Sequence, residues 1–356
     1  MAISFQVNRS SIRETQFVDP GHRDLAPGEV RFDIDFVALT SNNVTYAVAG
    51  DLLDYWGFFP VGLPWGHVPA MGYGTVVESA NGVVEEGARH FGFFPMAEQH
   101  IVLVNGTDTG LFDIGAHRAP HAPAYRQFAD VAKDPSWDPD REAHVALLRG
   151  LFLTSWLAED LLFDNDNFGA DVTIITSASS KTSIAMGWSV QQRGGVSVGL
   201  TSEANRAFVE RLGCYTEVVT YDEIGELDAD RRSVVVDMAG NGAILAEVHN
   251  HFGGTLAHSM AIGGSHWESF GQQHEMAGPA PQFFFAPAQI EKRTRDWGAG
   301  EPMRRISKAF ADYVTFTDAW LEIDHATGRD AFAGAWHALV DGDVAPHFGL
   351  IRSMNG

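Results

Sequence analysis

The sequence lacks the features that would cross-link the chain or anchor it in a membrane. Cys214 is the single cysteine in 356 residues, which excludes an internal disulfide and a thiolate metal cluster. No apolar run approaches the ~18 residues that a membrane-spanning helix needs. The opening segment, "MAISFQVNRSSIRETQF", has no apolar core of the kind found in signal peptides. We therefore expect a cytoplasmic protein without membrane contact.

Positive charge is also scarce. The chain carries 24 Lys and Arg against 46 Asp and Glu, for a formal net charge of -22. Because binding to a phosphate backbone needs clustered Lys and Arg, this balance excludes general nucleic-acid binding and leaves a small molecule as the expected partner. The hydrophobic content of 45% is that of a folded globular protein, and the length allows two domains with cores of their own.

The first hundred residues are predicted to form strands. The stretch "EVRFDIDFVALT" (29–40) alternates apolar and polar residues, "MGYGTVVES" (71–79) is a second strand, and "ARHFGFFPMAEQHIVLV" (88–104) bends into a third. Short strands punctuated by glycine are typical of a barrel or sandwich. Residues 105–139 are rich in Gly, Asp and Pro, which predicts a long connection.

The pattern changes near residue 140. A helical period covers 140–163, followed by strand, turn and helix (172–193), a strand (196–200), a helix (203–212) and two further apolar strands, "SVVVDMAG" and "TLAHSMAIGG". Such alternation predicts a parallel sheet covered on both faces. The end of the chain is predicted as strand, helix and a final strand that returns to the first domain. The expected class is α/β, with a discontinuous strand-rich domain (1–140 and 309–356) and a doubly wound domain (141–308).

The turn after the strand at Val172 has no glycine. Phosphate-binding turns use glycine to reach φ > 0 and to let the backbone approach the phosphates, whereas this turn, 177–182, reads "SASSKT". The helix N-terminus can still bind an anion, with hydroxyls and one lysine added. One interpretation is therefore a dinucleotide-binding turn, and the other is that Ser179 only caps the helix. The predicted cofactor-binding residues here are Ser177, Ser179, Ser180, Lys181 and Thr182.

The next strand ends without a carboxylate, at "GLTSEANR" (199–206). Sites that prefer NAD place Asp or Glu at this point to bind the ribose hydroxyls. Thr201, Ser202 and Arg206 could instead hold a 2′-phosphate, which predicts NADP. Two alternatives remain open: Ser202 caps a helix while Arg206 stays in solvent, or Glu203 turns toward the ribose and favours NAD.

Several stretches together resemble a known family. They are "TYAVAG" (45–50), "VVESANGVVEEGARHFGFFPMAEQHIV" (76–102), "LFLTSW" (151–156), "DMAGNGAI" (237–244) and "HFGGTLAHSMAIGG" (251–264). In order and spacing the chain is similar to the medium-chain dehydrogenase/reductase superfamily, in its zinc-independent quinone oxidoreductase branch. Where that family reads "GASGGVGS", this chain has "TSASSKTS". No Cys or His-Glu pair stands where zinc-dependent members carry their metal, so no metal site is predicted.

The resemblance implies a GroES-like barrel domain joined to a Rossmann domain, and a homodimer that pairs through the strand at 255–264. It also implies that Tyr46 approaches the nicotinamide, that Thr154 lies beneath it, and that Gly263 belongs to the cofactor-binding residues.

Three polar side chains are candidates for catalysis. Tyr46 could donate a proton, or be a packed tyrosine whose hydroxyl satisfies a backbone group. Asn42 could hydrogen-bond a carbonyl oxygen, or be a turn residue. His266 follows the strand whose end should face the nicotinamide and could transfer protons, or it could be held by a loop backbone.

The leading hypothesis is an NADPH-dependent, metal-independent reductase of an activated double bond or a quinone, with Tyr46 or a water as proton donor. A lyase or isomerase that uses tightly bound NADP for transient oxidation is an alternative. A cofactor-free binding protein on a reductase scaffold is another.

Overall fold

The computed structural model describes residues 2–238, 240–262 and 275–355. The chain divides into two compact units, the barrel unit (1–147 and 321–356) and the sheet unit (148–320). The expected domain ends at 140 and 309 differ from these limits. Helix α2 (Glu142–Asp164) runs through the first limit, and α7 (Glu301–Thr317) continues past residue 309 within the sheet unit.

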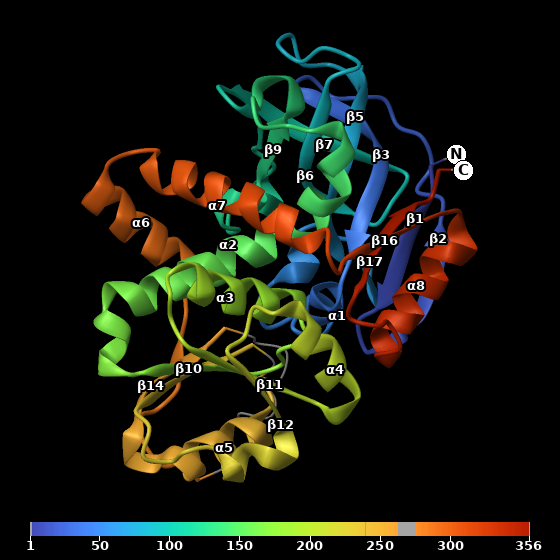
Figure 1. Ribbon diagram of the computed structural model, residues 1–356. Helices are drawn as coiled ribbons and strands as arrows, with labels where there is room; N and C mark the ends of the chain where they lie inside the picture. The colour runs from blue at the N-terminus through green and yellow to red at the C-terminus, as the bar shows by residue number, and fades with distance from the viewer. Residues whose placement is uncertain (1, 239, 263–274, 356) are drawn as a thin grey trace. The chain divides into compact units, whose positions relative to one another are not determined.

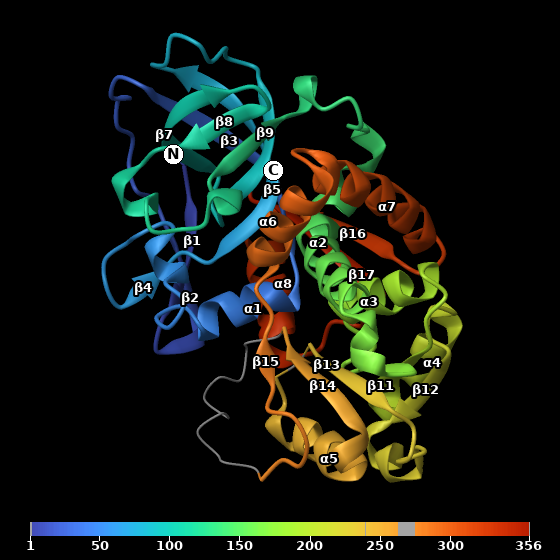
Figure 2. The same cartoon turned by 90° about the vertical axis from the view of Figure 1, so that its left-hand side faces the viewer.

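The barrel unit is built around a closed sheet. Strand β3 pairs with β5 along most of its length and with β7 through Glu29–Asp33, so the sheet closes on itself. Figure 2 shows β7, β8 and β9 together in this unit. The strands in order around the barrel are β3 (Glu29–Leu39), β5 (Pro69–Ser79), β6 (Arg89–Pro95), β9 (Gln127–Asp130), β8 (Gly110–Asp113) and β7 (Gln99–Thr107).

Residues 105–139 are therefore more than the long connection that the sequence predicts. They contain the end of β7 together with β8 and β9, two strands of four residues each. Two short 3-10 turns lie between β8 and β9, and two more lie between β9 and α2. A strand of four residues shows too few alternations to be recognised from its sequence. These strands form because β6 and β7 pair with them. Examples of the paired residues are His90↔Asp130 and Asn105↔Phe112.

The remaining elements of the barrel unit pack around this sheet. A small sheet has the order β2-β1-β4, and α1 (Ser41–Val48) follows β3. Strand β17 (Phe348–Ser353) pairs antiparallel with β3 and parallel with β16 (Glu322–Thr327), so the predicted return of the last strand is confirmed. Helix α8 (Arg329–Asp341) packs Phe332 against Phe5, with 5.3 Å between ring centroids. The bounds of the small sheet are β1 (Ser4–Asn8), β2 (Ser11–Val18) and β4 (Trp65–Gly66).

The sheet unit has a six-stranded parallel sheet in the order β12-β11-β10-β13-β14-β15. Strands β10, β11 and β13 are buried at every position, because helices cover both faces. Figure 1 shows α2 and α3 on one face and α5 on the other. The strands are β10 (Val172–Ile175), β11 (Ser197–Thr201), β12 (Glu217–Thr220), β13 (Ser233–Asp237), β14 (Leu256–Ala261) and β15 (Gln282–Phe283). The helices are α3 (Lys181–Gln192), α4 (Glu203–Leu212), α5 (Gly242–Phe252), α6 (Ala286–Trp297) and α7.

The strand expected at the edge of this sheet, within 255–264, is not the last one. Strand β15 pairs with β14 at Met260↔Gln282 and Ala261↔Phe283, so this end of β14 is covered. The error arose because a two-residue strand leaves no pattern in the sequence. The homodimer stays a prediction, and its proposed edge has to include β15.

Among the described residues, no helix combines the length and the apolar character needed to cross a membrane. The 23 residues of α2 are long enough, but Arg149, Glu159 and Asp160 interrupt their apolar character.

Candidate functional site

Polar side chains gather where β10, β11 and β13 end, and we call this region the carboxyl edge (176–182, 201–202 and 237–240). Its first part is the turn from β10 to α3. Ser177 has φ +50, the left-handed region that glycine occupies without steric cost. A serine there costs roughly 1 kcal/mol or more. The conformation is held because the amide of Ser180 donates to the Ser177 carbonyl at 2.8 Å, and that of Ala178 donates to the Leu200 carbonyl at 2.8 Å.

The turn itself has no glycine, but two glycines on neighbouring elements leave room for it. A Cβ on Gly199 of β11 would lie 2.9 Å from the Ala178 Cβ and 3.0 Å from the Tyr215 ring. A Cβ on Gly187 of α3 would lie 2.5 Å from the same ring. The Tyr215 hydroxyl donates to the Ala178 carbonyl at 2.9 Å. Close packing of turn, helix and strand is therefore achieved with glycine outside the turn, and Tyr215 fastens the turn in place.

Two serine hydroxyls of the turn, those of Ser179 and Ser180, have partners within the chain. Ser180 is the N-cap of α3, and its Oγ accepts the Ser183 amide at 3.1 Å. The alternative interpretation, in which Ser179 caps the helix, is therefore wrong. The sequence could not distinguish two adjacent serines as caps. The Ser179 Oγ accepts the side-chain amide of Asn205 at 3.2 Å. Lys181 is the first residue of α3, and burial lowers its pKa to about 8.

The end of β11 differs, because its hydroxyls are not satisfied in this way. Thr201 is buried, and its Oγ1 has no hydrogen-bond partner among the described residues. Ser202 is the N-cap of α4 but makes no capping hydrogen bond through its side chain. A buried hydroxyl without a partner costs about 1–3 kcal/mol. The end of β11 is thus the part of the carboxyl edge that a ligand would complete.

Arg206 has carboxylate partners already. Its Nη1 is 2.8 Å from Glu223 Oε1, and its Nε is 3.1 Å from Glu210 Oε1. Glu203 lies one turn earlier on α4, 3.9 Å from the same guanidinium, and its side chain is 79% exposed. A 2′-phosphate would have to compete with Glu223 for Arg206.

At the carboxyl edge, Asp237 links the end of β13 to the end of β10 through a hydrogen bond. The Thr176 hydroxyl donates to Asp237 Oδ1 at 2.7 Å and accepts the Met238 amide at 2.9 Å. The Gly240 amide donates to Asp237 Oδ2 at 3.1 Å, with Gly240 at φ +69. This turn opens "DMAGNGAI" (237–244), one of the stretches that carry the family resemblance. The role of Thr176 was not foreseen from the sequence, where nothing connects it to a residue 61 positions away.

Two other predicted cofactor residues lie on helices of the sheet unit, Thr154 on α2 and Thr182 on α3. Thr154 is half-buried on α2, and its hydroxyl donates to the Gly150 carbonyl at 3.1 Å. Its neighbour Ser155 donates to the carbonyl of Thr182 at 2.7 Å, so this turn of α2 lies against the start of α3. The predicted residues Gly263 and His266 lie outside the described residues.

The barrel unit contributes an aromatic cluster around Tyr46, which lies on α1. The Tyr46 ring is 4.4 Å from that of Tyr55 and 5.9 Å from that of Phe93. Asn42, one turn earlier, donates its side-chain amide to the Tyr46 hydroxyl at 3.4 Å. Burial raises the pKa of Tyr46 well above its ordinary value. The cluster also contains Phe58, Phe59, Met71 and Tyr125.

Asn43, the neighbour of Asn42, has a structural role. It is buried, completes a capping box with Thr40, and donates to the Pro69 carbonyl at 2.9 Å. Beside the aromatic cluster, Arg118 is 1% exposed, pairs with Asp113 at 3.2 Å, and lies 4.3 Å above the Phe58 ring. Through these contacts Arg118 stabilises the 3-10 turns that follow β8.

No three His, Cys, Asp or Glu side chains in the described part of the chain come together as metal ligands would. Independence from zinc remains a prediction.

Comparison with known proteins places the chain by its fold. CurA from Vibrio vulnificus, solved in complex with NADPH, superposes with a TM-score of 0.65 at 11% identity over 99% of both chains. The CurK enoyl reductase gives 0.59 at 12% identity, also over 99% of both chains. Quinone oxidoreductase from Pseudomonas syringae pv. Tomato DC3000 gives 0.56 at 14% identity over 99% of this chain and 100% of that one. The predicted class, an α/β chain with a barrel domain and a doubly wound domain, is confirmed.

Comparison of sequences, in contrast to comparison of structures, gives a match to a family. No curated protein matches the chain. Residues 37–345 match a family described as "Protein of unknown function (DUF2855)". Because that match covers most of the chain, the protein belongs to the DUF2855 family, with the fold of enoyl and quinone reductases.

Proposed function

We propose that the chain is an NADPH-dependent reductase of an activated carbon–carbon double bond or a quinone. The observation that carries the proposal is the buried Thr201 hydroxyl, which has no partner among the described residues, at the end of a strand without a carboxylate. The strained turn at Ser177 supports it, since such conformations cluster at functional sites. NADPH in the CurA structure and the reductase names of the structural neighbours support it as well.

The residues of the carboxyl edge fit a dinucleotide. The first turn of α3 presents backbone amides and a partial positive charge to the pyrophosphate, with Lys181 beside them. Thr201 and Ser202 offer hydroxyls to the ribose and its 2′-phosphate. Because Arg206 is engaged by Glu210 and Glu223, the preference for NADP would rest on these hydroxyls more than on the guanidinium. The bound dinucleotide would supply a hydride.

Tyr46 has the properties of a hydrogen-bond donor to the substrate. Its raised pKa keeps the hydroxyl protonated at every physiological pH. Asn42 donates to the Tyr46 oxygen, which leaves the phenolic hydrogen available for a carbonyl oxygen that gains negative charge on reduction. A group with so high a pKa transfers a proton poorly, so we assign final protonation to water and orientation to Tyr46 and Asn42.

The test is oxidation of NADPH by the purified protein with 2-cyclohexenone or 1,4-benzoquinone. We expect turnover with one of them, and a kcat lowered about a hundredfold in Tyr46→Phe, because a donor to developing charge is lost. The matched control is Tyr221→Phe, which removes a hydroxyl in the sheet unit and should leave kcat unchanged. An unchanged kcat in Tyr46→Phe would remove Tyr46 from the mechanism.

A cofactor-free binding protein is the second candidate, because the hydroxyls of Ser179 and Ser180 already have partners within the chain. Thermal unfolding distinguishes the two. NADPH at a hundred times its Kd should add about 2.7 kcal/mol to the free energy of unfolding. A protein that is stabilised by neither NADPH nor NADH would support the binding protein. Stabilisation without turnover would favour the lyase or isomerase.

A further inference from the structure

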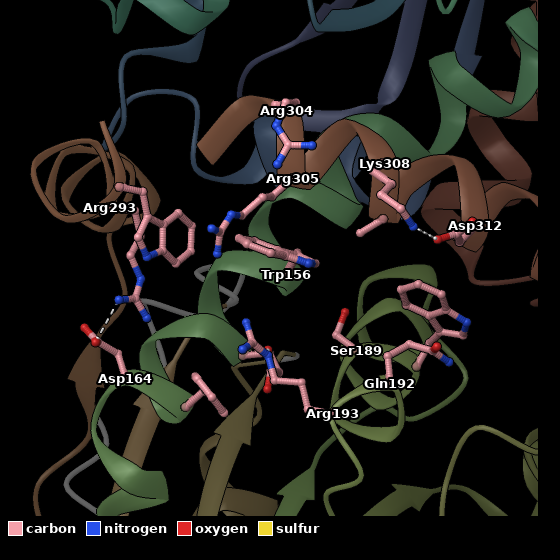
Figure 3. Close-up of a pocket in the computed structure, with 15 residues that line it drawn as sticks. Trp156, Asp164, Ser189, Gln192, Arg193, Arg293, Arg304, Arg305, Lys308 and Asp312 are labelled. Atoms are coloured by element: carbon pink, nitrogen blue, oxygen red, sulfur yellow. Dashed lines mark hydrogen bonds and ion pairs between the residues drawn. The ribbon is translucent and has the colours of Figure 1, made fainter. Parts of the chain in front are cut away.

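A cavity in the sheet unit lies away from the carboxyl edge. It has a volume of about 610 Å³ and is lined by residues of α2, α3, α6 and α7 (Figure 3). Helix α3 starts at the carboxyl edge, and its last residue, Gln192, and its C-cap, Arg193, line this cavity. A helix of 12 residues is about 18 Å long, so the two sites occupy opposite ends of α3. We call the second site the helical cavity.

Indole rings form much of the wall of the helical cavity. Trp156 comes from α2, Trp188 from α3 and Trp297 from α6. The rings of Trp156 and Trp297 are 6.4 Å apart at 73°, so they meet edge to face. Trp156 and Trp297 are only half-buried. Flat apolar faces of this kind favour a planar ligand.

Cations outnumber carboxylates along the same wall, although the whole chain has a net charge of -22. The basic lining residues are Arg193, Arg293, Arg304, Arg305 and Lys308, and the acidic ones are Glu159, Asp164 and Asp312. Burial raises the pKa of Glu159 to about 7, which weakens its negative charge at neutral pH. All five cations pair with carboxylates, including Asp160, Asp296 and Glu301, which lie behind the lining. The wall therefore has no excess of positive charge, and an anion would bind through guanidinium nitrogens that these ion pairs do not use.

The cations have two different roles. Arg193 and Arg293 both bind Asp160, which is fully buried, at 3.0 Å and 2.5 Å. They hold α3 and α6 to α2 and form the base of the cavity. Arg305 and Lys308 on α7 are exposed, and each binds one carboxylate, Glu301 for Arg305 and Asp312 for Lys308.

Arg305 is the cation best placed for a ligand. Its Nε donates to Glu301 at 2.8 Å, and its two terminal nitrogens bond to no described residue. Its guanidinium lies 4.2 Å above the Trp297 ring, and Figure 3 shows it reaching from α7 toward Trp156. A carboxylate bound there would accept a charge-assisted pair of hydrogen bonds.

We propose that the helical cavity binds a planar aromatic carboxylate of one or two rings, with its ring against the indoles and its carboxylate on Arg305 and Lys308. The volume is in the range of small-molecule sites. An inorganic anion would leave the indole faces unused, and a neutral aromatic would leave the terminal nitrogens of Arg305 without an anionic partner. The site is independent of the proposed reductase activity.

The experiment is isothermal titration of the full chain with 2-naphthoate, and with 2-naphthamide as its neutral counterpart. We expect one saturable site for the carboxylate, and an affinity about tenfold lower for the amide, because a charge-assisted bond is lost. Arg305→Gln should weaken 2-naphthoate about tenfold as well. The matched control is Arg295→Gln, since Arg295 is an exposed α6 residue that pairs with Glu291 outside the cavity.

A second variant tests the position of the site without touching a charge. Ala309 lines the cavity from α7, and Ala309→Trp should fill it and abolish 2-naphthoate binding while the protein still unfolds cooperatively. Equal affinity in wild type, Arg305→Gln and Ala309→Trp would overturn the proposal. So would displacement of 2-naphthoate by NADPH, which would place the probe at the carboxyl edge.

Discussion

The carboxyl edge and the helical cavity lie in the same unit, and both suit anions, but they do so with different chemistry. The edge offers hydroxyls and the first turn of a helix. Apart from Arg206, Lys181 is the one cation among the predicted cofactor-binding residues. The cavity offers full charges, several of them already paired, set among indoles. Dipoles fixed by the backbone need no counterion when the ligand is absent. Buried charges do, which is why Asp160 lies beneath Arg193 and Arg293.

The difference predicts where each region is sensitive. In the cavity, removing one partner of a buried ion pair exposes the other to an apolar surrounding and is costly. At the edge, the strained Ser177 and the unsatisfied Thr201 weaken the ligand-free protein, so some replacements there should increase stability at the expense of binding.

The largest effect is expected for Arg293→Met, which leaves Asp160 buried with only Arg193 and Gln289 as partners. We expect the free energy of unfolding to fall by about 3–5 kcal/mol, measured by urea denaturation. Arg295→Met on the same helix should change it by less than about 0.5 kcal/mol. A small loss for Arg293→Met would show that the ion pairs beneath the cavity contribute little.

An intermediate effect of opposite sign is expected for Thr201→Val. Removing a buried hydroxyl that has no partner should raise the free energy of unfolding of the ligand-free protein by about 1 kcal/mol. It should also weaken NADPH about tenfold. Thr317→Val is the matched control, because Thr317 is equally buried but donates to the Val314 carbonyl at 2.7 Å, so its loss should destabilise. If Thr201→Val also destabilises, the hydroxyl has a partner in the folded chain.

The smallest effect concerns pH. Burial lowers the pKa of Lys181 from 10.5 to about 8. In the ligand-free protein, this group therefore makes the free energy of unfolding rise as pH increases from about 8 toward 10.5, where only the unfolded chain keeps the proton. A bound pyrophosphate favours the charged amine, so NADPH affinity should fall several-fold between pH 7 and 9. Lys181→Met should flatten this profile, and an unchanged slope in the variant would mean that another group titrates.

Local pattern determined the sheet unit well. Apolar strands at 172 and 233, each followed by a turn and a helix, are recognisable because each is buried on both faces within one short stretch. The glycine-free turn at Ser177 was identified in the same way. The sequence could not indicate which hydrogen-bond partner, if any, each hydroxyl has. Ser180 caps, Ser179 binds Asn205 and Thr201 binds no described residue, and each outcome depends on a neighbour from another element.

By itself, then, the sequence determined the α/β class, the order of strands and helices around the carboxyl edge, and the return of the last strand to the first domain. Tertiary structure alone decided the closure of the barrel, where β3 pairs with β7 and the short β8 and β9 complete the sheet. It alone decided that Gly199 makes room for the turn, and that residues of four helices enclose the helical cavity. The physical reason is the range of the interactions. Hydrophobic periodicity acts within one element, whereas strand closure, close packing and ion pairing join residues whose separation along the chain carries no signal.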